Sequence, residues 1–64
     1  MEFIKISRTQ AADFLEGKLD FDRGFLMLKG YGDDWENYTG VFPEDDLSEN
    51  IREGAYDDFE IWFS

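Results

Sequence analysis

The sequence predicts an α+β domain in the order β-α-β-β-α-β, with one mainly antiparallel sheet and two short helices. A chain of 64 residues has room for one hydrophobic core, so we expect residues 1–64 to form a single domain. Twelve residues are aromatic and none is cysteine, so large side chains rather than disulfides must supply the core. Segments of alternating apolar residues enclose two segments with helical spacing, which is typical of one sheet and one helical layer.

A strand and a helix are expected first. Residues 2–6 are predicted to form a strand, with Ile4 and Ile6 on one face and Phe3 and Lys5 on the other. Ser7 and Gln10 have the spacing of a capping box, which predicts a helix over residues 8–17 that Gly17 can end in the left-handed conformation. The apolar stripe of this helix consists of Ala11, Phe14 and Leu15.

A hairpin is expected next. Residues 23–29 are apolar on both faces, which favours a central strand. The turn-forming residues 30–34 lead into a third strand over residues 35–42, so the hairpin loop has about five residues.

A short acidic helix and a last strand complete the pattern. The helix begins at Pro43 or at Asp46, and it ends at Glu53 before Gly54. Its narrow apolar edge predicts a place at the rim of the core. The strand over residues 56–63 has one buried face, formed by Phe59, Ile61 and Phe63, and Trp62 points to the other, partly exposed face.

Charge is distributed unevenly along the chain. The formal net charge is −10, and residues 33–64 hold eleven acids and one base, Arg52. Direct binding of nucleic acid is disfavoured, because this half would repel phosphates. Disorder is also disfavoured, because the acids are interleaved with aromatic residues.

Several kinds of chemistry find no support in the sequence. The chain contains no histidine and no cysteine, so the usual nucleophilic triads cannot form. No phosphate-binding glycine motif occurs, and residues 20–31 begin like a calcium loop but lack its glycine and glutamate positions. We therefore expect a protein that is not an enzyme and that carries no cofactor or metal, although the acids of residues 33–37 leave a loop cation site open as an alternative.

The acids of the second half are the candidate site, and we expect them to bind a partner protein. Asp45, Glu49 and Glu53 are spaced by four residues, so they form a row with about 6 Å between neighbours on a helix. The helix dipole explains acids in the first turn but not Glu53 at the other end. The full candidate set is Asp33, Asp34, Glu36, Asp45, Asp46, Glu49, Glu53, Asp57, Asp58 and Glu60.

In size, acidity and lack of catalytic residues the chain resembles the small acidic DNA-mimic inhibitors of phages and other mobile elements. These proteins block restriction enzymes, CRISPR nucleases, uracil-DNA glycosylase or DNA-binding regulators, and acidic immunity proteins of nuclease toxins are similar in the same way. The group shares no motif, so the resemblance assigns no residue. It implies an inhibitor that occupies the nucleic-acid site of a basic nucleic-acid-binding protein or nuclease.

Two further expectations concern the setting of the protein. The start of the chain lacks the pattern of a signal peptide and no apolar stretch is long enough to cross a bilayer, which predicts a cytoplasmic protein without membrane contact. The alternative function is a structural or assembly subunit whose acidity serves solubility. An exposed terminal strand that pairs with its own copy leaves a homodimer open.

Overall fold

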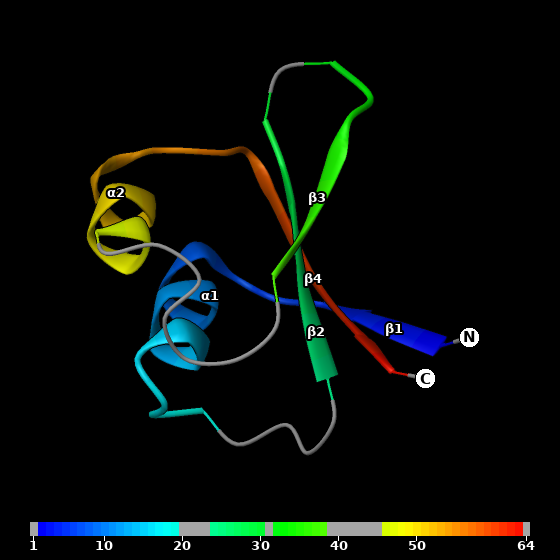
Figure 1. The fold of residues 1–64 in the computed structure, drawn as a ribbon, viewed down its shortest axis with the longest axis horizontal. Coiled ribbons are helices and arrows are strands. Elements are labelled where there is room, and N and C mark those ends of the chain that lie inside the picture. Colours follow the sequence, from blue (N-terminus) through cyan, green and yellow to red (C-terminus); the bar gives the residue numbers. More distant parts are fainter. Residues whose placement is uncertain (1, 20–23, 31, 39–45, 64) are drawn as a thin grey trace.

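The structure, a computed structural model, describes residues 2–19, 24–30, 32–38 and 46–63. It confirms the predicted α+β fold with the expected order of elements (Figure 1). The elements are β1 (Glu2–Lys5), α1 (Arg8–Leu15), β2 (Gly24–Lys29), β3 (Trp35–Tyr38), α2 (Leu47–Glu53) and β4 (Asp58–Phe63).

The sheet has the strand order β1-β4-β2-β3, and every neighbouring pair is antiparallel. β4 therefore lies between β1 and β2, which α1 connects. In the same way β2 lies between β3 and β4, which α2 connects. The fold thus consists of two interleaved split β-α-β units, and the two central strands, β2 and β4, belong to different units.

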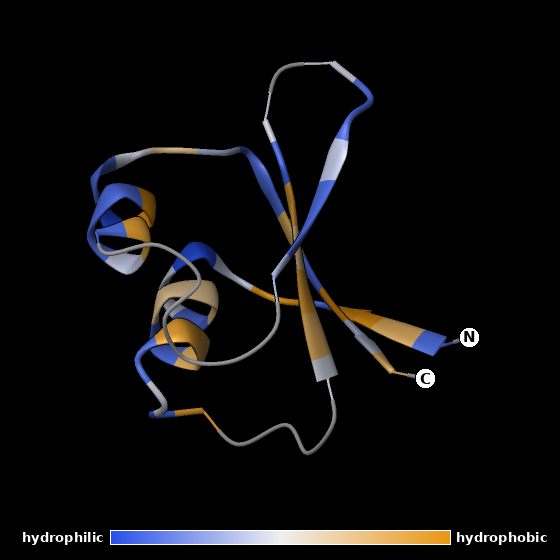
Figure 2. Cartoon of the chain, viewed as in Figure 1, coloured by the Kyte–Doolittle hydropathy of each residue, from blue (hydrophilic) through white to orange (hydrophobic). Residues whose placement is uncertain are grey.

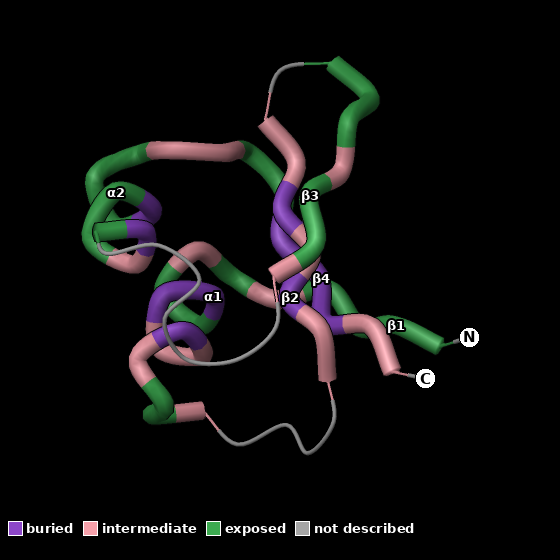
Figure 3. Tube along the Cα trace, viewed as in Figure 1, coloured by how far each residue is buried: buried purple, intermediate pink, exposed green. Residues whose placement is uncertain are grey.

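Both helices lie on the same side of the sheet, and the core fills the space between the layers (Figures 1 and 3). The apolar stretches of β2, β4 and both helices supply it (Figure 2). The buried apolar residues of the described chain are Ala11, Ala12, Leu15, Leu26, Leu28, Leu47, Ile51, Phe59 and Ile61. Neither helix covers the opposite face of the sheet, called the open face below, to which the alternation of the strands directs Phe3, Phe25, Met27, Glu60 and Trp62.

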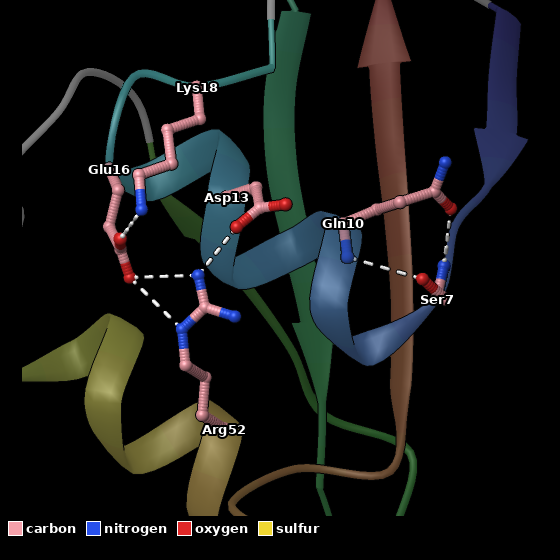
Figure 4. Close-up of polar contacts among 6 residues, drawn as sticks. All are labelled: Ser7, Gln10, Asp13, Glu16, Lys18 and Arg52. Atoms are coloured by element: carbon pink, nitrogen blue, oxygen red, sulfur yellow. Dashed lines mark hydrogen bonds and ion pairs between the residues drawn. The ribbon is translucent and has the colours of Figure 1, made fainter.

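Local sequence signals position α1 as expected. The Ser7 hydroxyl accepts a hydrogen bond from the Gln10 amide at 3.2 Å, and the Gln10 side chain accepts one from the Ser7 amide at 2.9 Å (Figure 4). Gly17 adopts the left-handed conformation with φ 77°. The capping box is therefore confirmed, although the helix ends at Leu15, two residues before the predicted end.

The start of α2 lacks a side-chain cap. Asp46 is the N-cap residue, as one of the two predicted starts requires, but its side chain makes no capping hydrogen bond. The other start, at Pro43, lies outside the described residues, as does the end of the third strand beyond Tyr38. Leu47 and Ile51 are buried against α1, so the narrow apolar edge seen in the sequence does anchor the helix.

The strands β4 and β1 are each shorter than the sequence predicts. β4 begins at Asp58 rather than at residue 56, because Tyr56 has a positive φ of 65° that a strand residue does not adopt. β1 ends at Lys5, so Ile6 stands between strand and helix, where it packs against the core.

Candidate functional site

Five of the candidate acids gather at one end of the sheet, where β2 ends and β3 and β4 begin. This sheet-end cluster consists of Asp33, Asp34, Glu36, Asp57 and Asp58, all of them exposed. Lys29, the last residue of β2, lies within it: its Nζ is 3.6 Å from the Asp33 carboxylate, and it is the cross-strand partner of Asp58. The Lys29 carbonyl also accepts a 2.7 Å hydrogen bond from the Asp57 amide, so one residue joins the hairpin to the start of β4.

Glu36 links two parts of the sheet-end cluster through tyrosine hydroxyls. Its Oε2 accepts hydrogen bonds from Tyr38 and from Tyr56, each at 2.8 Å. These bonds, that from Tyr38 first, hold the pKa of Glu36 below its usual range. Burial, and then the interactions of its hydroxyl with Tyr56 and Glu36, raise the pKa of Tyr38. Glu36 is therefore a fixed, ionised carboxylate that ties β3 to the segment preceding β4.

The acids of α2 form a second group. Asp46, Glu49 and Glu53 are exposed, and the last two lie one helical turn apart, about 6 Å. Asp45, the first member of the predicted row, lies outside the described residues. Figure 1 shows α2 and the β2–β3 hairpin on different sides of the molecule, and the segment that follows α2 leads into β4. The structure thus brings together five of the predicted acids at the sheet end and three on α2.

The placement of Glu60 among the exposed acids is wrong. Only 5% of its surface is exposed, and its Oε1 accepts a 2.8 Å hydrogen bond from the Trp62 indole. Its cross-strand neighbours are Lys5 on β1 and Met27 on β2. Alternation correctly directs Glu60 away from the helices, but neighbouring side chains on the open face bury it, and no local pattern shows that.

Arg52, the one base of the second half, pairs with acids of the other helix and not with Glu49, three residues before it. Its guanidinium reaches across to α1, where it binds Asp13 and lies 3.1 Å from Glu16 (Figure 4). Lys18 pairs with the same Glu16 at 3.0 Å. Lys18 and then Arg52 lower the pKa of Glu16, and Asp13 and Glu16 raise that of Arg52. Arg52 therefore ties the two helices together and forms no ion pair with the described acids of its own helix.

Arg8 is a residue that sequence reasoning missed. Its guanidinium donates hydrogen bonds to the carbonyls of Ile51, Ala55 and Tyr56, at 2.9, 2.7 and 2.8 Å. It also lies 5.1 Å from the centre of the Phe59 ring. A base in the first turn of α1 opposes that helix's own dipole, and this was the one local sign that Arg8 serves another element.

Most of the described Lys and Arg side chains form hydrogen bonds or ion pairs within the molecule. Arg8 caps α2, Arg52 and Lys18 bind acids of α1 and its C-cap, and Lys29 lies in the sheet-end cluster. Among the described residues, no ion pair joins a base to Asp34, Asp57, Asp58 or the three α2 acids. Within the described residues, the negative charge of these six acids is therefore displayed on the surface without an ion-pair partner.

Within the described parts of the chain, no group of three acids is arranged to hold a metal ion. No helix there is long and apolar enough to cross a membrane. Compared with known proteins, the chain matches no protein-family model, no curated protein and no solved structure.

Proposed function

We propose that the protein inhibits a nucleic-acid-binding protein or nuclease by occupying its basic nucleic-acid site, with carboxylates in place of phosphates. The observation that carries the proposal is that most of the described bases, Arg8, Lys18, Lys29 and Arg52, make internal contacts, while the acids of α2 and of the sheet end face solvent. A site built to bind phosphates offers Lys and Arg side chains, and such a site attracts any dense array of negative charge.

A decoy for a polyanion must hold its charges in fixed positions, because ordering them on binding would weaken the complex. Three contacts hold α2 against the rest of the molecule: the buried side chains of Leu47 and Ile51, the Arg8 cap at its end, and the Arg52 bridge to α1. At the sheet end, Glu36 and Lys29 join the strands that carry the acids. Both acidic groups are therefore attached to ordered elements.

The proposed binding is electrostatic, so it should depend strongly on salt. We expect a partner captured from host-cell lysate at low salt to be released as salt rises, and duplex DNA to compete with the protein for the same partner. Affinity measured by calorimetry across a salt series tests this with the captured partner. An affinity that stays flat from low to high salt would contradict the mechanism.

Position as well as net charge should matter. Glu53→Gln on α2 should weaken binding by up to about fivefold, since an exposed ion pair is worth at most about 1 kcal/mol. Glu2→Gln removes the same charge from β1, on a different part of the surface, and should leave affinity nearly unchanged. Equal losses from the two substitutions would mean that net charge alone, and not an array on α2, attracts the partner.

A further inference from the structure

β1 is an edge strand with unpaired backbone groups. It has a neighbour, β4, on one side only in the described sheet. The Ile6 amide donates a 3.1 Å hydrogen bond to the Phe59 carbonyl, in register with the β1–β4 pairing. Because the direction of backbone groups alternates along an antiparallel strand, Ile4 also points its N–H and C=O toward β4. Phe3 and Lys5 point theirs outward, away from the sheet.

The same strand carries the exposed large apolar side chains of the described chain. These are Phe3, 49% exposed, and Ile4, 40% exposed, one on each face of the strand. On the open face Phe3 stacks on Trp62 with ring centres 5.5 Å apart, and Phe25 continues the row on β2. Figure 3 shows no buried segment along β1. At Phe3 and Ile4 this edge is apolar on both faces, it contains no proline, and Lys5 is the only one of its residues with the positive charge that commonly discourages strand pairing.

A second copy of β1 fits this edge in one register better than in others. Antiparallel pairing about a two-fold axis perpendicular to the sheet keeps the two faces of the copies aligned, so residues that lie opposite one another must share a face. Placing Ile4 opposite Ile4 of the second copy puts Phe3 opposite Lys5 of that copy. Phe3 and Lys5 then exchange both of their outward hydrogen bonds, so every outward N–H and C=O of these two residues gains a partner.

The side chains agree with this register. Across the junction, the two Ile4 side chains meet on the helical face, and their burial favours association. On the open face, Lys5 stands between Glu60 of its own sheet and Phe3 of the second copy, where an ammonium group gains from both a carboxylate and an aromatic ring.

The distribution of charge points to the same edge. β1 contains one acid, Glu2, and one base, Lys5, whereas the sheet-end cluster and the α2 acids lie elsewhere. Figure 1 shows β1 on the opposite side of the molecule from α2 and below the β2–β3 hairpin. Two chains of net charge −10 repel one another, and contact through β1 keeps their acidic groups far apart.

We propose that the protein forms a symmetric dimer in which β1 pairs antiparallel with β1 of a second copy, Ile4 opposite Ile4. The two sheets then form one continuous sheet with all helices on one side, and the acidic groups of the copies lie at its two ends.

Charged substitutions at the two-fold axis test the proposal, because a partly exposed Ile4 can be replaced without emptying the core. Sedimentation analysis should show a dimer for the wild-type protein, monomers for Ile4→Lys and for Ile4→Glu, and a mixed dimer when the two variants are combined, since opposite charges then meet. Circular dichroism checks that each variant is folded. Asn37→Lys, an exposed change on the other edge strand β3, is the matched control and should dimerise as the wild type does.

Three results would overturn the proposal: a wild-type protein that stays monomeric at millimolar concentration, charged variants that do not associate when mixed, or an Ile4→Lys variant that dimerises by itself. Salt separates this interaction from the proposed inhibitory binding. Screening reduces the repulsion between copies, so the dimer should strengthen as salt rises, whereas binding of a basic partner should weaken.

Discussion

The two glutamates of the strands β3 and β4 lie in opposite environments, although the sequence places both in the same acidic set. Glu36 is exposed, yet two tyrosine hydroxyls hold its carboxylate. Glu60 is buried, and the Trp62 indole donates to it. Each contact keeps a charged oxygen hydrogen-bonded, but only Glu36 remains available on the surface. Within a region so rich in acids, the side chains that lie next to a carboxylate decide its role.

The tyrosine contacts of Glu36 should make its contribution to stability depend on pH. Because its pKa in the folded protein lies below the ordinary 4.5, the stabilisation is present above that value and is lost as pH falls through the folded-state pKa. Glu36→Gln should therefore lose less free energy of unfolding than the wild type between about pH 7 and about pH 3. Urea denaturation across this range measures the difference.

Tyr56→Phe provides a graded comparison, because it removes one of the two hydroxyl donors and leaves the carboxylate. Its acid dependence should lie between those of the wild type and Glu36→Gln. If Glu36→Gln and the wild type lose stability in parallel as the pH falls, the tyrosine bonds do not stabilise the ionised carboxylate.

Among the elements, α2 depends most on residues far away in the sequence. Its apolar contact is narrow, its N-cap side chain makes no hydrogen bond, and Gly54 ends it with φ 126°. Arg8, at the start of α1, supplies hydrogen bonds to Ile51 and to the two carbonyls that follow Gly54. The orientation of the α2 acids therefore depends on a base in the other helix.

Replacing Arg8 should loosen α2 more than its position on a helix surface suggests. Arg8→Lys cannot reproduce a planar fork that binds several carbonyls, and Arg8→Met leaves those carbonyls without their donor. We expect losses of about 2 kcal/mol for Arg8→Lys and about 3 kcal/mol for Arg8→Met in the free energy of unfolding. Urea denaturation measures both changes.

Lys18→Met is the control for the loss of one positive charge, because Lys18 is exposed and forms a surface pair. It should cost less than about 1 kcal/mol. A loss as large as that of Arg8→Met would attribute the effect to net charge instead of to the cap.

The contrast between the helices shows what could be predicted from the sequence. The start of α1 was predictable because Ser7 and Gln10 are three residues apart and both capping hydrogen bonds run between these two neighbours. The Arg8 contacts join residues more than forty positions apart in the chain. The cross-strand pairing of Glu60 with Lys5 does the same. Periodicity and capping rules describe neighbours on one element, so they predicted the elements and the acidic half but not these contacts.

For the whole molecule, charge repulsion opposes folding. A net charge of −10 on a chain of 64 residues destabilises the compact state, because folding brings the acids closer together. Salt shortens the range of this repulsion to about 10 Å at 0.1 M. The melting temperature should therefore rise as sodium chloride is added, although the Arg52 bridge weakens at the same time.

Calorimetry at several salt concentrations and low protein concentration tests this expectation. Glu53→Gln, which removes one exposed charge from the last turn of α2, where the helix dipole disfavours an acid, should raise the melting temperature at low salt and reduce its salt dependence. A melting temperature that falls with added salt would mean that the attractive pairs outweigh the repulsion.

The position of β4 between β1 and β2 has a consequence for how the chain folds. β4 is the last of the described strands, yet it pairs with the first one and with a central one. While a ribosome is still making the chain, β1 has no strand to pair with, and β2 can pair only with β3. The sheet therefore closes in one late step, after residue 58 and those beyond it become available, and a nascent chain halted before that point would hold the β2–β3 hairpin and the two helices without the strand that joins β1 to β2.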